Sequence, residues 1–318
     1  MTAISSSPPL CQETSKLTEW RNNADNDSSI VRLYNFYFLS SMPPKNFTPI
    51  RIRQFKDAVW RQYHEQGRHD MPWRHTKNPY RITVSEIMLQ QTQVERVKRY
   101  YTVFLRAFPT WQALDRASLK DVLALWQGMG YNRRAKYLKQ MAQQIVHAHH
   151  SKFPRDFKIL TTLPGVGKAT AGAILTYTYN APVPFIETNI RRAYLHWFFA
   201  DDTAVHDRDI MELVEQTIDR DNPREWCWAL MDYGTMLALT TAKTANPNRR
   251  SKHYIRQSKF SGSTRELRGK IIALLLKKPH TKQELLTQTT RSATEVDNIL
   301  TQLMREQLIQ KQSGKYSI

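Results

Sequence analysis

Two closely spaced glycines, Gly165 and Gly167, stand in the segment LPGVGKATAGAIL, just before a run of small residues with helical character. Glycine lets the backbone turn tightly and lets a ligand approach it closely. The first turn of a helix also carries N–H groups without backbone partners, which favour an anion. The pattern therefore predicts a phosphate-binding loop, although a bare pair of glycines is more often a turn used only for packing.

The charge of the chain favours a polyanionic partner. Lys and Arg total 47 against 28 Asp and Glu, which gives a formal net charge of +19. The sequence contains no run of about 18 apolar residues and no single basic amphipathic segment, so it predicts no membrane association. Nucleic acid is the expected partner, and composition alone leaves ribosomal, RNA-binding and chromatin-like proteins open beside DNA enzymes.

Cysteine usage excludes two further kinds of site. Cys11 and Cys227 lie far apart in unrelated contexts. They cannot assemble a disulfide framework or a cysteine metal site, so we expect no bound metal. This usage fits a reducing cytoplasm.

The elements that must position the glycine loop are helices. Segments such as IRQFKDAVWRQYHEQG, SLKDVLALWQGMG and PREWCWALMDYGTMLAL repeat apolar residues at about the helical period. No segment alternates convincingly like a strand before the C-terminal end of the chain. We therefore expect an all-α main body.

Composition divides the chain into four parts. Residues 1–44 lack sustained periodicity and any secretory signal, so we expect a flexible tail. Residues 45–245 form the helical body, residues 246–263 a polar and basic connector, and residues 264–318 a second unit. Met42 is a second candidate start of translation, which N-terminal sequencing tests.

The second unit has the element order of a winged helix. Thr281 with Glu284, and Ser292 with Glu295, have the spacing of capping boxes before apolar helices. The final segment LIQKQSGKYSI predicts a short hairpin. We expect a winged-helix-like domain whose second capped helix enters a DNA groove.

A family resemblance decides between the interpretations of the glycine loop. Residues 163–175 resemble the helix-hairpin-helix of the endonuclease III superfamily, and YRITVSEIMLQQTQV resembles the matching segment of MutY-type adenine DNA glycosylases. The segments MPWR, LWQGMGYNRRAKYL and ALMDYGTM agree in order and spacing, so the resemblance spans roughly residues 55–236. It implies a two-lobed helix-hairpin-helix glycosylase fold, double-stranded DNA as partner, and a monomer associated with the nucleoid.

The resemblance assigns two carboxyl groups to catalysis. Glu86 stands where the family places the acid that protonates the leaving adenine, and Glu187 stands where it places the carboxylate that stabilises the sugar cation, beside Asn189. The family normally has Asp at position 187, and the extra methylene moves the carboxylate by about 1.5 Å, a displacement that can cost on the order of 100-fold in rate. Three outcomes are left open. The protein is an active variant with an adapted pocket, an enzyme with a changed substrate, or a protein that binds DNA without catalysis.

Two other departures from the family concern its chemistry. Bifunctional relatives carry a Schiff-base lysine where this chain has Ala169, and Lys168 faces another side of the helix, so we expect a monofunctional enzyme. Relatives carry four cysteines after the MDYG-like stretch. This chain has Ala238 at the first of these positions, so we expect no iron–sulfur cluster. The loop NPNRRSKHYIRQSK is expected to supply the DNA contacts of the cluster loop.

The resemblance also implies how DNA is held. Gln91 and Tyr131 are expected to wedge into the duplex beside the flipped base, although Tyr131 is equally well explained as a core aromatic. Other expected DNA contacts, each of which is also explained as an ordinary surface or packing residue, are Arg133, Arg134, Lys136, Arg191, Arg192, Leu163, Gly165, Val166, Gly167 and Lys168.

The substrate that the resemblance implies is adenine opposite guanine or 8-oxoguanine. Relatives of this type usually end in a Nudix-like domain that inspects the opposite base, whereas this chain ends in the winged-helix-like unit. Uracil, thymine or hypoxanthine as the excised base is the enzymatic alternative. A non-catalytic DNA-binding protein is the alternative of a different class.

Overall fold

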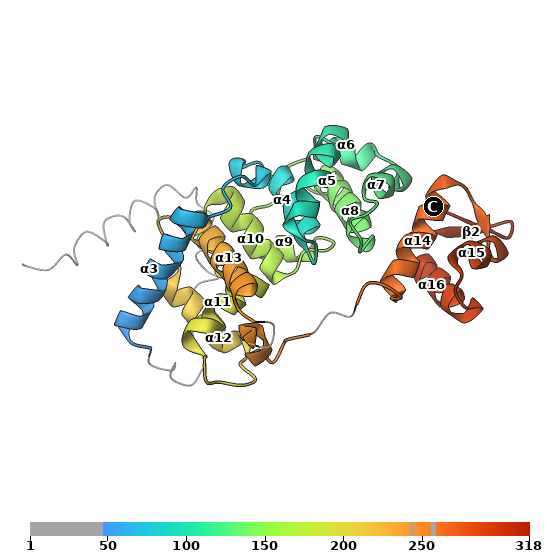
Figure 1. Cartoon of the computed structure of the whole chain (residues 1–318). Helices are drawn as coiled ribbons and strands as arrows, with labels where there is room; N and C mark the ends of the chain where they lie inside the picture. Colours follow the sequence, from blue (N-terminus) through green and yellow to red (C-terminus); the bar gives the residue numbers. More distant parts are fainter. Residues whose placement is uncertain (1–46, 243–244, 256–258) are drawn as a thin grey trace, which may run out of the picture. The chain divides into compact units, whose positions relative to one another are not determined.

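The computed structural model describes residues 47–242, 245–255 and 259–318 of the chain (Figure 1). The expected N-terminal tail, Met42 and Cys11 lie outside these described residues. The expected all-α main body is confirmed. Its helices are α3 (Pro49–Gln66), α4 (Pro79–Leu89), α5 (Val94–Ala107), α6 (Trp111–Arg116), α7 (Leu119–Leu125), α8 (Arg133–His147), α9 (Phe157–Thr162), α10 (Lys168–Tyr179), α11 (Thr188–Phe198), α12 (Asp207–Thr217) and α13 (Pro223–Thr240), with the 3-10 turns η1 (Pro72–His75) and η3 (Pro247–Arg250).

Local sequence sets where two of these helices begin. Thr48 and Asn78 cap α3 and α4 by accepting hydrogen bonds from backbone N–H groups in the first turn. A proline follows each cap at the first helical position, where its missing N–H leaves no donor unpaired. The start of α4 is therefore fixed by its own residues.

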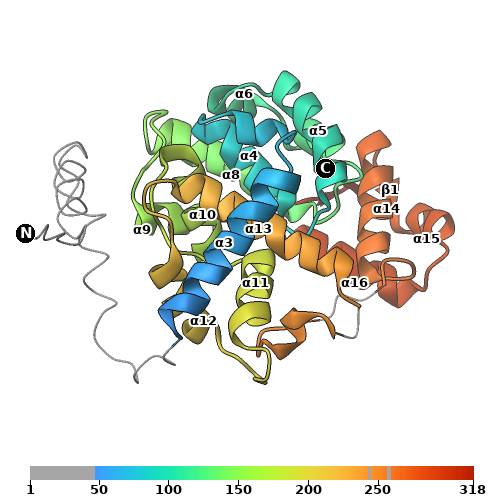
Figure 2. The ribbon, with the colours of Figure 1, turned by 60° about the vertical axis from the view of Figure 1, so that its left-hand side comes forward.

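The buried side chains of the described residues form two clusters, which fits the expected two lobes. One cluster joins α3 to α11, α12 and α13, and Figures 1 and 2 show α3 beside α13. The other cluster draws on the helices from α5 through α9 and extends into the C-terminal unit. Because both clusters draw on α4 and α10, these two helices lie where the lobes meet. The segment AGAILTYT of α10 is correspondingly buried on every side.

The C-terminal unit has the predicted element order, with one addition. It comprises α14 (Thr264–Lys277), β1 (His280–Thr281), α15 (Lys282–Thr289), α16 (Ala293–Arg305), β2 (Gln310–Gln312) and β3 (Lys315–Ser317). Both capping boxes form, and the hairpin turns at Ser313 and Gly314, which both have positive φ. The antiparallel sheet has the order β1-β3-β2, and the two-residue strand β1 was not predicted. Entry of α16 into a DNA groove stays a prediction.

The first part of the expected connector is packed against the body. Pro247 and Asn248 in η3 are buried, and Ser251 forms a parallel bridge with Val205. Asn248 Nδ2 donates a hydrogen bond to Thr188 O at 3.1 Å, at the start of α11. This stretch is therefore a docked turn, and residues 256–258 of the same loop lie outside the described part of the chain.

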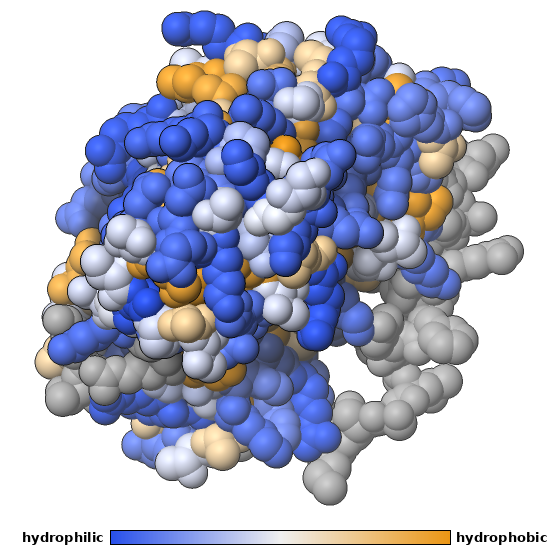
Figure 3. Space-filling view, turned by 90° about the vertical axis from the view of Figure 1, so that its right-hand side faces the viewer, coloured by the Kyte–Doolittle hydropathy of each residue, from blue (hydrophilic) through white to orange (hydrophobic). Residues whose placement is uncertain are grey.

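The surface is largely hydrophilic on the face that Figure 3 shows, where hydrophobic residues are scattered among hydrophilic ones. In the described part of the chain, the helices are all too short or too polar to span a bilayer.

Candidate active site

Glu86 lies on α4 at the junction of the two lobes. Its neighbours Ser85 and Ile87 are almost wholly buried, while Glu86 keeps part of its surface accessible to solvent although protein surrounds it. Burial raises the pKa of its carboxyl to about 8, the negative charge of Glu187 adds to this rise, and the Arg74 guanidinium opposes it. Glu86 is therefore mostly protonated at neutral pH and can act as a proton donor.

Glu187 is the N-cap of α11. Its Oε1 accepts hydrogen bonds from the backbone N–H groups of Asn189 at 2.6 Å and Ile190 at 2.7 Å. Glutamate is not among the preferred N-cap residues, but here its longer side chain still reaches the helix terminus. Burial raises the pKa of Glu187, whereas these two hydrogen bonds and the charges of Arg192 and Arg191 stabilise its anion.

The two carboxyl groups lie close enough to act on each other and on the same neighbours. The charge of Glu187 acts on Glu86, and both carboxylates act on the hydroxyl of Tyr177, whose pKa burial raises well above its usual value. Glu187 also raises the pKa of the buried Cys227 thiol, after burial itself. We call these side chains the carboxylate cluster and define it by Glu86 on α4, Tyr177 on α10, Glu187 at the start of α11 and Cys227 on α13.

Sequence reasoning missed the aromatic side chains that support this cluster. The ring of Tyr177 stacks on Trp228 with ring centroids 5.7 Å apart, and its hydroxyl donates to Met231 Sδ at 2.8 Å. The guanidinium of Arg74 lies 5.4 Å from the centroid of Trp228 on its face. The available signal was a pair of tyrosines within the largely buried helix α10, which gives no periodic pattern of its own.

The MPWR and MDYG segments meet in a buried ion pair. Arg74 donates two hydrogen bonds of 2.8 Å to the carboxylate of Asp232, and Arg68 donates to the same carboxylate. Burial alone would raise the pKa of Asp232, but the hydrogen bonds and charge of Arg74, with a further contribution from Arg68, lower it below its usual value. This pair ties η1 to α13 and holds Arg74 near the carboxylate cluster.

Gly234 lets α11 and α13 cross at close range. A Cβ at this position would lie 2.1 Å from the carbonyl oxygen of Asn189, a distance that no side chain tolerates. The glycine of the MDYG segment therefore allows α13 to support the turn that carries Glu187 and Asn189.

The predicted hairpin connects α9 to α10. Gly165 has φ +79°, and the side chain of Tyr137 packs against it. Gly167 begins α10 without a side-chain cap among the described residues, so N–H groups of the first turn face outward beside the exposed Lys168. The side chains of Leu163 and Val166 are buried, which corrects their prediction as DNA contacts except through their backbone.

Both predicted wedge residues have a left-handed backbone. Gln91 has φ 53° and Tyr131 has φ 49°, conformations that cost free energy in residues other than glycine. Gln91 is exposed, whereas Tyr131 is half-buried, and its hydroxyl accepts a hydrogen bond from Arg265 Nη1 at 2.9 Å. Strained positions of this kind concentrate at functional sites.

Comparison with known proteins identifies the family. The model of the HhH-GPD superfamily of base excision DNA repair proteins matches residues 84–219. The adenine DNA glycosylase of Mycobacterium tuberculosis (strain ATCC 25618 / H37Rv) is 30% identical over 304 residues, which cover 84% of this chain and 94% of that relative. The chain is a MutY-type member of the HhH-GPD superfamily.

Other relatives agree with this membership. The adenine DNA glycosylase of Buchnera aphidicola subsp. Baizongia pistaciae is 34% identical over 196 residues, which cover 60% of this chain and 55% of the relative. The chain therefore spans about half the length of this curated relative. A solved thermostable thymine-DNA glycosylase superposes with a TM-score of 0.55 at 25% identity, over 59% of this chain and 88% of that one. The predicted family and HhH-GPD fold are confirmed.

The structure corrects the expected role of Arg134 in this HhH-GPD protein. Its side chain is 7% exposed and turns inward, so it is not available to a DNA phosphate. The acceptors of its hydrogen bonds are the carbonyl oxygens of Ile87, Met88, Gln90, Met129 and Gly130 and the hydroxyl of Thr92. Arg134 therefore joins the end of α4 to the loop that carries Tyr131.

Other predicted phosphate contacts also have partners within the chain. Arg191 forms two hydrogen bonds of 2.7 and 2.8 Å with Asp207, and Arg133 pairs with Glu306. Lys136 Nζ donates to the carbonyl oxygen of Glu306 at 2.5 Å. Arg192 is 8% exposed and binds inside the protein, which corrects its prediction as a phosphate contact. Arg133 and Arg191 stay predictions.

The residues of this family member do not fit the iron–sulfur cluster of its relatives. The sequence holds two cysteines, whereas such a cluster takes four thiolates. Cys227 is buried within α13 beside Glu187. Among the described residues, η3 follows α13 and packs against α11.

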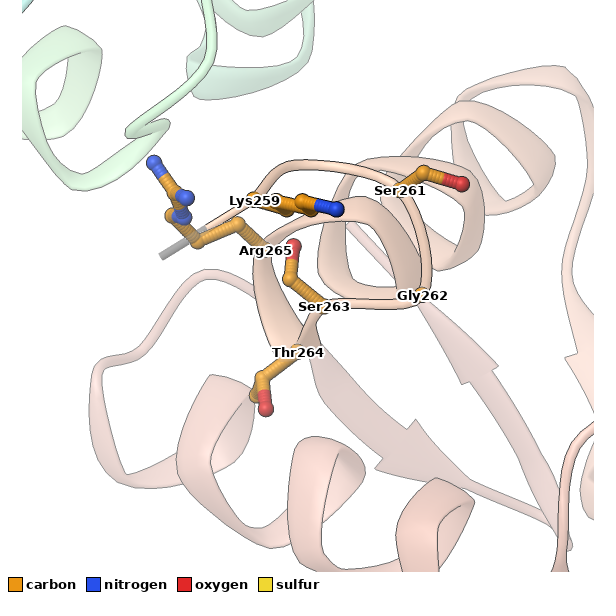
Figure 4. A pocket seen from close by; sticks show the side chains of 6 residues that line it. All are labelled: Lys259, Ser261, Gly262, Ser263, Thr264 and Arg265. Carbon is orange, nitrogen blue, oxygen red and sulfur yellow. The ribbon is translucent and has the colours of Figure 1, made fainter. Parts of the chain in front are cut away.

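A separate open hollow lies near the start of α14 (Figure 4). Its lining residues are Lys259, Ser261, Gly262, Ser263, Thr264 and Arg265. Neither Glu86 nor Glu187 lines it. The candidate active site is the carboxylate cluster, because it brings the two carboxyl groups together.

Proposed function

We propose that this chain is a DNA glycosylase that hydrolyses the N-glycosidic bond of adenine mispaired with guanine or 8-oxoguanine in double-stranded DNA. The observation that carries the proposal is the difference between the surroundings of two neighbouring carboxyl groups. Burial raises the pKa of Glu86 to about 8, while burial also raises the pKa of Glu187 but two backbone hydrogen bonds oppose that rise by stabilising its anion. Two carboxyl groups whose environments separate their protonation states form an acid and an anion.

The proposed reaction begins with protonation of the base. Adenine leaves poorly as an anion, so Glu86 donates a proton to a ring nitrogen as the glycosidic bond breaks. Glu187 stabilises the positive charge that develops on the sugar, and a water molecule then completes hydrolysis. Release of its proton lets Glu86 help to activate that water. The free base and an abasic site are the products.

We propose that a flipped purine binds beside the two carboxyl groups. The buried ring of Tyr177, which stacks on Trp228, holds its hydroxyl near both carboxylates. Gln91 and Tyr131 are proposed to fill the space that the base leaves in the duplex. The N–H groups that open α10 at Gly167 are proposed to bind a phosphate of the same strand.

The same residues support a monofunctional enzyme without a cluster. Ala169 has no amine, and Lys168 is exposed at the first position of α10. We propose that Arg249 and Lys252, exposed around η3, contact DNA in place of a cluster loop. The enzyme is proposed to act as a monomer, associated with the nucleoid of a bacterial cytoplasm.

One assay tests the proposal. Duplexes carrying adenine opposite 8-oxoguanine, adenine opposite guanine, thymine or uracil opposite guanine, and hypoxanthine are incubated with the enzyme and then analysed with and without alkali. Excision of adenine, with strand breaks only after alkali, is expected. Breaks without alkali would contradict the monofunctional assignment, and inertness on every duplex would support the non-catalytic alternative.

Pyrimidine excision is the second candidate, favoured by the superposition on a thymine-DNA glycosylase. Removal of thymine or uracil needs less help from an acid than removal of adenine. Under this alternative, E86Q retains excision on the thymine or uracil duplex. Under the main proposal, the same substitution abolishes excision of adenine.

A further inference from the structure

Arg192 occupies the interior of the protein directly behind the catalytic carboxylate. Its Nη1 donates hydrogen bonds of 2.7 Å to Asn189 Oδ1 and 2.7 Å to the carbonyl oxygen of Gly234. Its Nε lies 3.5 Å from Asn246 Oδ1 in the turn before η3. Arg192 is therefore held from α13 and from the η3 segment, and it contacts Asn189 within its own helix.

The contact with Arg192 fixes which atom of the Asn189 side-chain amide faces the guanidinium. A guanidinium carries donors and no acceptor, so Asn189 must present its carbonyl oxygen to Arg192. The Nδ2 amino group then faces the other way, 3.4 Å from Glu187 Oε2. Glu187 thus receives N–H groups at both oxygens, because the backbone of Asn189 and Ile190 already donates to Oε1.

We propose that Arg192 is a positioning residue that locks the Asn189 side chain with its amino group toward Glu187 and so keeps Glu187 anionic and in place. This inference deepens the proposed function and rests on it for its catalytic consequence. Without Arg192, the amide of Asn189 can rotate and present its oxygen to Glu187. An oxygen there favours the protonated acid, which cannot stabilise a sugar cation.

Other charged or titratable groups lie around Glu187, so a test must separate the orienting effect of Arg192 from their effects on the pKa of Glu187. The charged or titratable groups that face it are Glu86 on α4, Tyr177 on α10, Cys227 on α13, and Arg191 and Arg192 on α11. Arg191 is the matched control. It carries the same charge on the adjacent residue, but its guanidinium binds Asp207 rather than Asn189.

Titration of the free protein tests the inference without any substrate. Glutamate side chains are labelled with carbon-13 at the carboxyl, and E187Q identifies the Glu187 signal in the NMR spectrum. We expect R192M to raise the titration midpoint of Glu187 by about one pH unit, and R191M to raise it clearly less. Equal shifts in R191M and R192M would mean that charge alone matters, and an unchanged midpoint in R192M would likewise overturn the inference.

Kinetics test the catalytic consequence. Single-turnover excision rates at saturating enzyme are measured across pH for the wild type, R192M, R192K and N189A. R192M is expected to slow excision about 10- to 100-fold with unchanged DNA affinity and to move the acidic limb of the profile to higher pH. R192K, which still donates to Asn189, should recover part of the rate and of the limb.

A double substitution separates positioning from general loss of structure. The double variant N189A/R192M should have its acidic limb of the pH–rate profile at the same pH as N189A alone, because no Asn189 amide remains for Arg192 to orient. Additive effects would contradict the inference. If R192M does not fold, N246A, which removes the Nε contact together with the Asn246 cap of η3, is expected to shift the Glu187 midpoint upward by a smaller amount, and no shift would count against the inference. An inert wild type would refute the proposed function, while the titration would still decide the role of Arg192.

Discussion

Glu86 and Glu187 are chemically identical side chains whose surroundings separate their tasks. Glu86 lies on a helix face among apolar neighbours, where burial favours the neutral acid, whereas Glu187 caps a helix whose N–H groups favour the anion. Each assignment makes a different prediction.

The first prediction concerns the alkaline limb of activity. Glu86 must be protonated to donate, and its pKa of about 8 means that it loses its proton above this pH. The single-turnover rate of adenine excision should therefore be flat near neutrality and fall about tenfold per pH unit well above pH 8. E86Q should reduce the rate by at least about 100-fold at neutral pH, because general acid catalysis contributes about 10² to 10⁴, and the deficit should shrink well above pH 8. An alkaline limb near pH 5 would contradict the assignment.

E86Q should increase the stability of the protein although it decreases the rate of excision. The pKa of Glu86 is raised on folding, so its contribution to stability is complete below the unfolded value near 4.5 and is lost as pH rises through about 8. E86Q removes this ionisation, so it should raise the melting temperature increasingly between pH 6 and pH 9. Thermal melts of both proteins at each pH provide the measurement, and a difference that does not grow with pH would be evidence against a buried neutral Glu86.

Glu187 gives a sharper prediction because the family normally has Asp there. If the active site has adapted to the longer side chain, E187D pulls the carboxylate back by about 1.5 Å and should slow excision on the order of 100-fold. Aspartate is a preferred N-cap, so the melting temperature should be unchanged or higher. Faster excision by E187D would show that the active site still fits aspartate.

The sequence indicated that the two carboxyl groups act together, and it misplaced two arginines. Glu86 and Glu187 lie near enough for the charge of Glu187 to raise the pKa of Glu86, while their catalytic roles stay predictions. Arg134 and Arg192 were predicted at the DNA surface because charged residues are rarely buried without partners, and sequence does not reveal those partners. Their partners include the carbonyl groups of Met88 and Gly234, which come from distant segments that no local pattern encodes.

At the scale of elements, the crossing of α11 and α13 supports the site. G234A places a methyl group 2.1 Å from the carbonyl oxygen of Asn189, so the helices must separate. We expect a loss of at least about 1–3 kcal/mol in unfolding free energy, as for overpacked cores, together with a loss of excision. Urea denaturation and the excision assay measure the two effects.

Gly269 provides the matched control for this substitution. It lies in the exposed middle of α14 with no atom within 4 Å of an added Cβ. G269A should stabilise the protein by about 0.5–1 kcal/mol because alanine favours a helix over glycine. A similar loss in both variants would contradict the packing explanation for Gly234.

Elements were predicted from sequence where periodicity was strong. Amphipathic helices such as α5 and α12, both capping boxes and the terminal hairpin all follow from local patterns. Strand β1 has two residues and cannot show alternation, and η3 looked like a polar linker although Pro247 and Asn248 are buried. Such features depend on tertiary contacts rather than on local preference.

At the scale of the whole molecule, Glu306 joins the C-terminal unit to α8. Its carboxylate pairs with Arg133 of α8 and with Arg268 of α14, and its carbonyl oxygen accepts from Lys136. The Arg268 and Glu306 side chains are 18% and 12% exposed, so E306A leaves a largely buried guanidinium without its carboxylate. We expect a loss of about 1–3 kcal/mol and faster proteolysis of the C-terminal unit.

Asp297 is the control for Glu306. It pairs with Lys282, and both side chains are almost half-exposed, so D297A should change stability by less than about 1 kcal/mol. Thermal melts and limited proteolysis of the full chain compare the two variants. Equal sensitivity to protease in E306A and the wild type would count against a docked C-terminal unit.

The helix α10 has one last consequence for how a damaged site is found. Its side chains belong to both hydrophobic clusters, so a hinge opening between the halves of the body would have to break buried contacts along this helix. We therefore expect the protein to receive a nucleotide that has already left the duplex rather than to close around one. Selectivity would then begin in the duplex, because a mismatched base pair opens more often than a matched one. This step precedes any contact between the base and a side chain of the protein.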